Sequence, residues 1–160
     1  ERALARELPP AYALRIAKKK AEKVSKQNEN SFVLAADTVV ACGRRIMPKA
    51  ETEAEANSCL NLLSGRRHKV LGAVVIYSPN GTQIYRVVKS VVTFKKLTQE
   101  EINFYLKTRE WEGKAGGYAI QGLAATYIRA LNGSYSNVVG LPLYETYQML
   151  RGMGFKYKVP

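Results

Sequence analysis

A single acidic residue, Asp37, lies inside an otherwise apolar and β-branched stretch that runs from Ser31 to Cys42. This composition predicts a buried strand. An unpaired carboxylate in such a strand costs several kcal/mol, so it needs a lysine, a metal ion or the mouth of a cleft. The alternative is an aspartate at a strand end that accepts backbone N–H groups. The residue types alone leave both interpretations open.

Three further motifs follow the A-A-D-T-V-V segment at 35–40: L-S-G-R-R-H at 63–68, K-A-G-G-Y-A-I-Q-G at 114–122 and G-S-Y-S-N-V-V-G-L-P-L at 133–143. In this order and spacing, they resemble the Maf family of nucleoside triphosphate pyrophosphatases from about Pro10 to Gly154. Ile120-Gln121-Gly122 resembles the family's pyrimidine-preferring dTTP/UTP branch. The resemblance implies one α/β domain over 1–160, with a mixed, elongated central β-sheet flanked by helices and two lobes with a cleft, as in inosine triphosphate pyrophosphatases.

The implied reaction is hydrolysis of dTTP, UTP or a modified pyrimidine nucleotide to the monophosphate and pyrophosphate. In-line attack on the α-phosphorus requires neutralised phosphate charge, a divalent cation and a positioned water. By resemblance, Asp37 is the catalytic and metal-associated carboxylate, and Mg²⁺ or Mn²⁺ is the expected ion. Glu1 is the candidate second metal ligand, and a frayed terminal residue is its alternative interpretation.

The remaining candidates contact the substrate. Lys49 and Lys114 are expected to bind phosphate as point charges, against the alternative of ordinary surface lysines. Gln121 is expected to recognise the base, because its amide offers a donor and an acceptor to the edge of uracil or thymine; the alternative is a buried amide bonded to a loop. Thr38 is a second specificity position by resemblance.

Two departures from the family pattern bear on activity. Met47-Pro48-Lys49 stands where the family usually has Gly-Lys-Pro, and residues 1–12 do not match the family's opening strand and Ser/Pro/Arg phosphate loop. The domain is therefore expected to be N-terminally truncated, as a fragment or by natural loss. The alternative function is a non-catalytic nucleotide-binding or septum-formation-related regulatory module.

Composition limits the other functions. No apolar run approaches the ~20 residues of a membrane span, and no signal peptide is visible. Two separated cysteines, Cys42 and Cys59, suggest a reducing compartment, so we expect a cytoplasmic protein. The net charge of +12 raises the possibility of nucleic acid. We do not expect nucleic acid as a partner, because no binding motif supports it; a homodimer is expected.

The expected elements interleave helices with strands. Helices are predicted at 11–27, 53–63, 98–107 and 141–151, and strands at 31–42, 46–47, 68–77, 83–95 and 124–131. Pro79-Asn80-Gly81 predicts a hairpin turn, and Thr52 and Thr98 have capping-box spacing to Glu55 and Glu101. The basic residues of the first helix, including Lys20, are expected on its solvated face.

Overall fold

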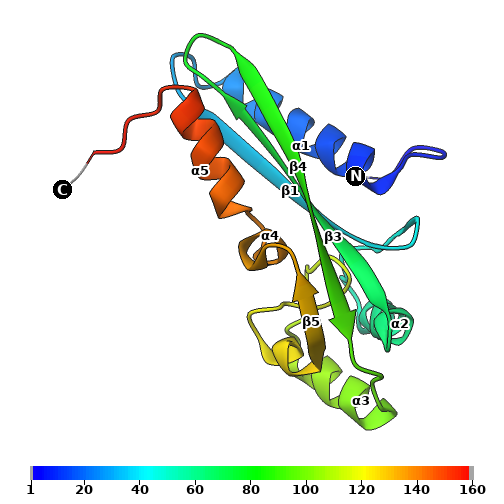
Figure 1. The fold of residues 1–160 in the computed structure, drawn as a ribbon. Coiled ribbons are helices and arrows are strands. Elements are labelled where there is room, and N and C mark those ends of the chain that lie inside the picture. The colour runs from blue at the N-terminus through cyan, green and yellow to red at the C-terminus, as the bar shows by residue number, and fades with distance from the viewer. Residues whose placement is uncertain (1, 159–160) are drawn as a thin grey trace.

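A computed structural model describes residues 2–158 as an α/β domain built on one long sheet (Figure 1). The predicted α/β fold, with an elongated sheet flanked by helices, is confirmed. In chain order the elements are α1 (Pro9–Ser25), β1 (Val33–Cys42), β2 (Arg45–Ile46), α2 (Glu53–Leu63), β3 (Arg67–Tyr77), β4 (Gln83–Phe94), α3 (Gln99–Thr108), the 3-10 helix η1 (Leu123–Tyr127), β5 (Ile128–Asn132), α4 (Tyr135–Val139) and α5 (Leu143–Gly152).

The sheet has the strand order β2-β1-β3-β4-β5. All four pairings are antiparallel, whereas the interleaved helices and strands predicted a mixed sheet. The difference arises because the chain re-enters beside β1 in the opposite direction after α2, so α2 is not a parallel crossover. Within residues 2–158, β2 pairs only with Ala41 and Cys42, so the rest of the outer edge of β1 carries no strand.

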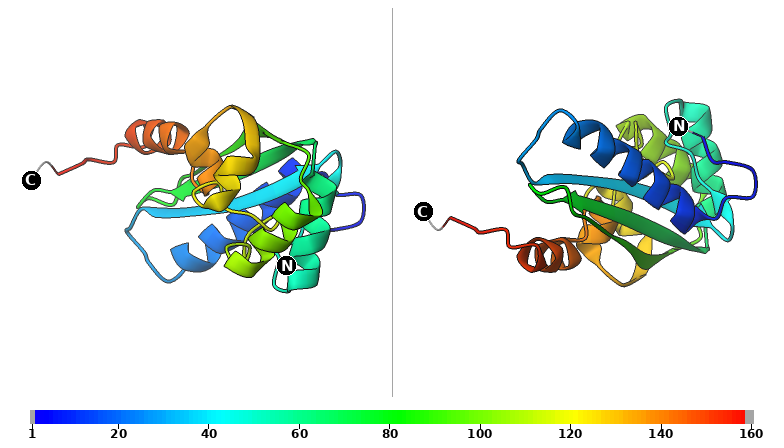
Figure 2. Two further views of the ribbon diagram at one scale, coloured as in Figure 1. Left: turned by 90° about the horizontal axis from the view of Figure 1, so that it is seen from below. Right: turned by 90° about the horizontal axis from the view of Figure 1, so that it is seen from above.

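The two faces of the sheet are covered by different helices, because successive side chains of a strand point to opposite faces. Helix α1 packs on one face, where Ala13, Ala17 and Ala21 meet Val39 and alternate residues of β3. The other face carries α5 at one end and α2, α3 and η1 at the other. Figure 2 shows α1 and α5 on opposite sides of the sheet.

Local sequence signals locate most element boundaries. Thr52 and Thr98 each accept a backbone N–H from the third residue of the helix that follows, and both capping boxes are complete. The strand predicted at 124–131 is wrong in its first half, where the chain forms η1 before entering β5. Ala124 and Tyr127 are buried three residues apart, which is the spacing of a 3-10 turn. The strand is predicted there because the segment is apolar, and apolar character alone does not separate the two structures.

Candidate active site

Asp37 lies in the middle of β1 and points to the face covered by α1. Its carboxylate Oδ1 accepts a hydrogen bond from Lys20 Nζ at 2.5 Å, and the residue is only 7% exposed. Lys20 therefore departs from the predicted solvated face of α1, and sequence reasoning missed it as a site residue. The signal was present, since a buried carboxylate demands a cation and Lys20 lies on the helix that covers its strand.

A pocket of about 280 Å³ lies on the opposite face of the same strand. It brings together four residues that the sequence singled out: Thr38, Lys49, Lys114 and Gln121. The rest of its lining is mainly apolar and consists of Ala36, Val40, Val70, Gly113, Ala115, Tyr118, Ala119, Ile120, Val138 and Val139. A small pocket in which a few polar groups converge among apolar side chains is typical of a site for one end of a small molecule.

Two backbone segments hold the two lysines side by side. Lys49 forms an isolated antiparallel bridge with Ala115, Ala50 N donates to Lys114 O at 3.1 Å, and Gly116 N donates to Pro48 O at 3.0 Å. The unusual Pro48-Lys49 order is thus compatible with a pinned loop. Both ammonium groups are exposed, and within residues 2–158 neither pairs with a carboxylate. Two uncompensated cations at one pocket favour an anionic ligand.

The two predicted specificity residues differ in how firmly they are held. The Gln121 side chain is exposed and forms no hydrogen bond with any described residue, which disfavours the alternative of a buried structural amide. Thr38 Oγ1 lies 3.4 Å from Gly140 O, at the loop that joins α4 to α5. Gln121 is thus available to a ligand, while Thr38 ties β1 to the opposite rim.

His68 and Tyr118 form the buried support beneath this pocket. His68 is 1% exposed, its Nε2 lies 2.7 Å from Tyr118 Oη, and its ring makes edge contacts with Phe94 and Tyr118. Burial lowers the pKa of His68 to about 4 and raises that of Tyr118. The imidazole is therefore neutral near pH 7, which agrees with a structural role rather than acid–base chemistry.

Asn137, from the G-S-Y-S-N-V-V-G-L-P-L motif, directly precedes Val138 and Val139, which line the pocket. It is fully buried, and its Nδ2 donates to Val70 O, Val88 O and Ser90 Oγ. A side chain at Gly72 would come within 2.0 Å of Asn137 Oδ1, so glycine is required opposite it. These contacts give Asn137 a structural role in closing the loop.

The structure does not bring every predicted residue to the pocket. Asp37 is absent from its lining because β1 directs Asp37 and Thr38 to opposite faces. Glu1 lies outside the described residues. Within 2–158, no three His, Cys, Asp or Glu side chains cluster as a metal site. Asp37 Oδ2 has no hydrogen-bond partner in this part of the chain, so one carboxylate oxygen remains available to a cation.

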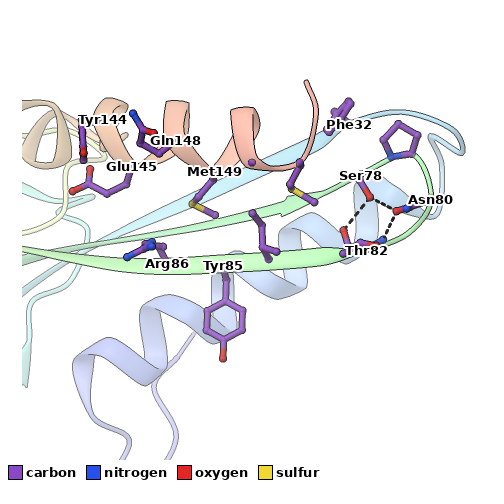
Figure 3. Close-up of a pocket in the computed structure, with 14 residues that line it drawn as sticks. Phe32, Ser78, Asn80, Thr82, Tyr85, Arg86, Tyr144, Glu145, Gln148 and Met149 are labelled. Atoms are coloured by element: carbon purple, nitrogen blue, oxygen red, sulfur yellow. Dashed lines mark hydrogen bonds between the residues drawn. The ribbon is translucent and has the colours of Figure 1, made fainter. Parts of the chain in front are cut away.

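A larger groove of about 1070 Å³ lies at the other end of the sheet, between α5 and the β3–β4 hairpin (Figure 3). Its floor includes Ile84 and Met149, and Arg86 and Glu145 line it. None of the site residues predicted from the sequence lies there. The smaller pocket, where four predicted residues converge, is therefore the candidate site although this groove is larger.

Among residues 2–158, no helix is both long enough and apolar enough to span a membrane.

Comparison with known proteins agrees with these motifs. The chain is 58% identical to a dTTP/UTP pyrophosphatase of Paramagnetospirillum magneticum, over 93% of this chain and 78% of that protein. It is 65% identical to a dTTP/UTP pyrophosphatase of Granulibacter bethesdensis, over 78% of this chain and 59% of the relative. It is 52% identical to a nucleoside triphosphate pyrophosphatase of Ehrlichia canis, over 92% and 77%. Residues 1–153 match the family described as Maf-like protein. On this match and these identities, the chain belongs to the Maf family.

Proposed function

We propose that this protein hydrolyses dTTP, UTP or related, including modified, pyrimidine nucleoside triphosphates to the monophosphate and pyrophosphate. The observation that carries the proposal is the pocket itself, where two unpaired lysines and a free amide converge. A triphosphate matches the lysines, and a pyrimidine edge matches the amide. The names of the relatives support the same substrates.

The proposed binding mode assigns one task to each group. Gln121 donates to O4 and accepts from N3–H of uracil or thymine, and Thr38 bounds the same pocket. Lys49 and Lys114 neutralise phosphate charge, which grows at the leaving pyrophosphate in the transition state. Asp37 points to the face of β1 opposite the pocket, so substrate contact with Asp37 requires the phosphate chain to extend beyond the pocket to that face. Asp37 is proposed to orient the attacking water there, with Lys20 holding its carboxylate.

A divalent cation, Mg²⁺ or Mn²⁺, is part of the proposal. The donor chemistry fits, because Mg²⁺ uses one or two carboxylates together with substrate oxygens, and Asp37 Oδ2 has no other partner within the described chain. Asp37 is the described residue that would hold the ion. When bound, the ion supplies charge neutralisation at the phosphates.

The decisive experiment compares kcat/KM for UTP, dTTP, CTP and ATP before and after Gln121→Glu. Leaving one polar group of the base unpaired costs ~1–3 kcal/mol, which corresponds to roughly 5- to 150-fold discrimination. We expect UTP and dTTP to be preferred, and the preference to shrink in the variant, because a carboxylate does not donate to O4. Unchanged ratios would place selectivity elsewhere, for example at Thr38.

The same assay separates catalysis from the alternative of a non-catalytic regulatory module, because only an enzyme releases pyrophosphate. No observation on this chain favours that alternative. We further propose a homodimer, to be tested by light scattering across a concentration series. A cytoplasmic location is proposed because free nucleoside triphosphates are the substrates.

A further inference from the structure

A short turn carries Gln121, and its geometry decides where the amide points. Gly122 N donates to Ala119 O at 3.1 Å, which closes a four-residue turn with Gln121 in its third position. The Gln121 side chain has no hydrogen bond of its own to residues 2–158. Its direction therefore depends on the groups that fix the turn on either side.

Two side chains fix this turn, Tyr105 from α3 and Glu110 from the segment that follows α3. Tyr105 Oη accepts a hydrogen bond from Ala119 N at 3.2 Å, at the start of the turn. Glu110 Oε2 accepts one from Leu123 N at 2.8 Å, immediately after it. Tyr105 is fully buried and Glu110 is half-buried, so both are held by their surroundings. The turn is thus anchored at its start to α3 and at its end to the segment that directly follows α3.

The carboxylate of Glu110 also packs directly against Gly122. A Cβ at that position would lie 2.2 Å from Glu110 Oε2 and 2.6 Å from its Cδ. The backbone of Gly122, at φ −104°, accepts an ordinary side chain. A side chain at this position would therefore have to displace the Glu110 carboxylate, the free end of a flexible side chain.

We propose that Glu110, assisted by Tyr105, is a positioning residue that sets the base preference of the pocket through Gln121. This inference rests on the proposed function, in which Gln121 recognises the pyrimidine. Loss of Glu110 frees Leu123 N and releases the exit of the turn. Lys49 and Lys114 keep their own backbone bonds, so phosphate binding is preserved. Base selectivity changes, while kcat for UTP is largely kept.

The test measures the ratio of kcat/KM for UTP and CTP in a set of variants. Glu110→Ala is expected to reduce the ratio roughly 5-fold or more, because the Gln121 side chain is then no longer held in the orientation that recognises the base. The reduction should come from a higher KM for UTP. Glu110→Gln keeps an oxygen that accepts from Leu123 N and retains most of the ratio. Glu112→Ala is the matched control, since this neighbouring carboxylate pairs with Arg109 at the surface and does not touch the turn.

Double variants separate positioning from general damage. In a Gln121→Ala background, Glu110→Ala should reduce the ratio no further, because both changes remove the same recognition. Gly122→Ala should by itself lower the ratio, and combining it with Glu110→Ala should lower the ratio no further than Glu110→Ala alone, because both changes remove the same contact of the Glu110 carboxylate with the turn. Additive losses, or an unchanged ratio in Glu110→Ala, would overturn the proposal.

Binding measurements keep this inference separate from the proposed function. Calorimetry with UMP and CMP reports base selectivity without turnover. A wild-type protein that prefers UMP but releases no pyrophosphate would refute the proposed hydrolysis alone. Selectivity for UMP that persists in both Glu110→Ala and Tyr105→Phe would refute the positioning role alone.

Discussion

Acid should destabilise this protein through a single buried imidazole, that of His68. Burial lowers its pKa from 6.5 to about 4. Between these values the unfolded chain binds more protons than the folded one, so the free energy of unfolding falls as pH decreases through this window and is flat above it. The pKa difference is worth about 3 kcal/mol in full. Between pH 7 and pH 5, His68 alone accounts for a loss of about 2 kcal/mol.

Urea denaturation at pH 7 and pH 5 measures this loss, and His68→Gln provides the comparison. The variant keeps a polar partner for Tyr118 and does not become charged, so its free energy of unfolding should fall about 2 kcal/mol less than that of the wild type. Carboxylates such as Glu101, whose pKa is lowered by its hydrogen bond with Lys95, titrate in both proteins. Their contribution to the pH dependence is therefore the same in both and cancels in the difference. Equal pH dependence in the two proteins would show that the imidazole is not buried in its neutral form. Should His68→Gln not fold, Tyr118→Phe is expected to retain the wild-type dependence.

Three further predictions concern the charged residues of the site. Asp37→Asn should abolish pyrophosphate release from UTP while circular dichroism and the melting temperature stay close to wild type; parent-level activity would exclude a catalytic role. Lys20→Met should lower kcat ~10-fold or more, because the carboxylate loses its ammonium partner. Lys49→Ala and Lys114→Ala should each lower kcat/KM ~10-fold or more through lost phosphate contacts. Lys23→Ala, at an exposed position of α1, is the control for all three, and an equal loss there would indicate only long-range attraction of the substrate.

The local elements and four residues of the pocket are predicted from the sequence alone. Capping boxes locate the starts of α2 and α3, and the β-branched run around Asp37 predicts β1, because these signals depend on neighbouring residues alone. Thr38, Lys49, Lys114 and Gln121 were selected from ordered motifs, and the fold brings them to one pocket. Residues that bind one ligand must lie close together in the fold. Motifs shared with a family of such proteins therefore indicate which residues converge.

The direction of the strands and the partners of the buried polar groups, by contrast, depend on how distant segments pack together. The chain turned back after α2, so the expected mixed sheet is antiparallel at every described pairing. Lys20 was predicted on the solvated face of α1 but pairs with Asp37, because α1 lies over β1 and the buried carboxylate needs a cation. Strand alternation then separated Asp37 from the pocket that holds Thr38. Such pairings join residues far apart in the chain, and no periodicity within one segment specifies them.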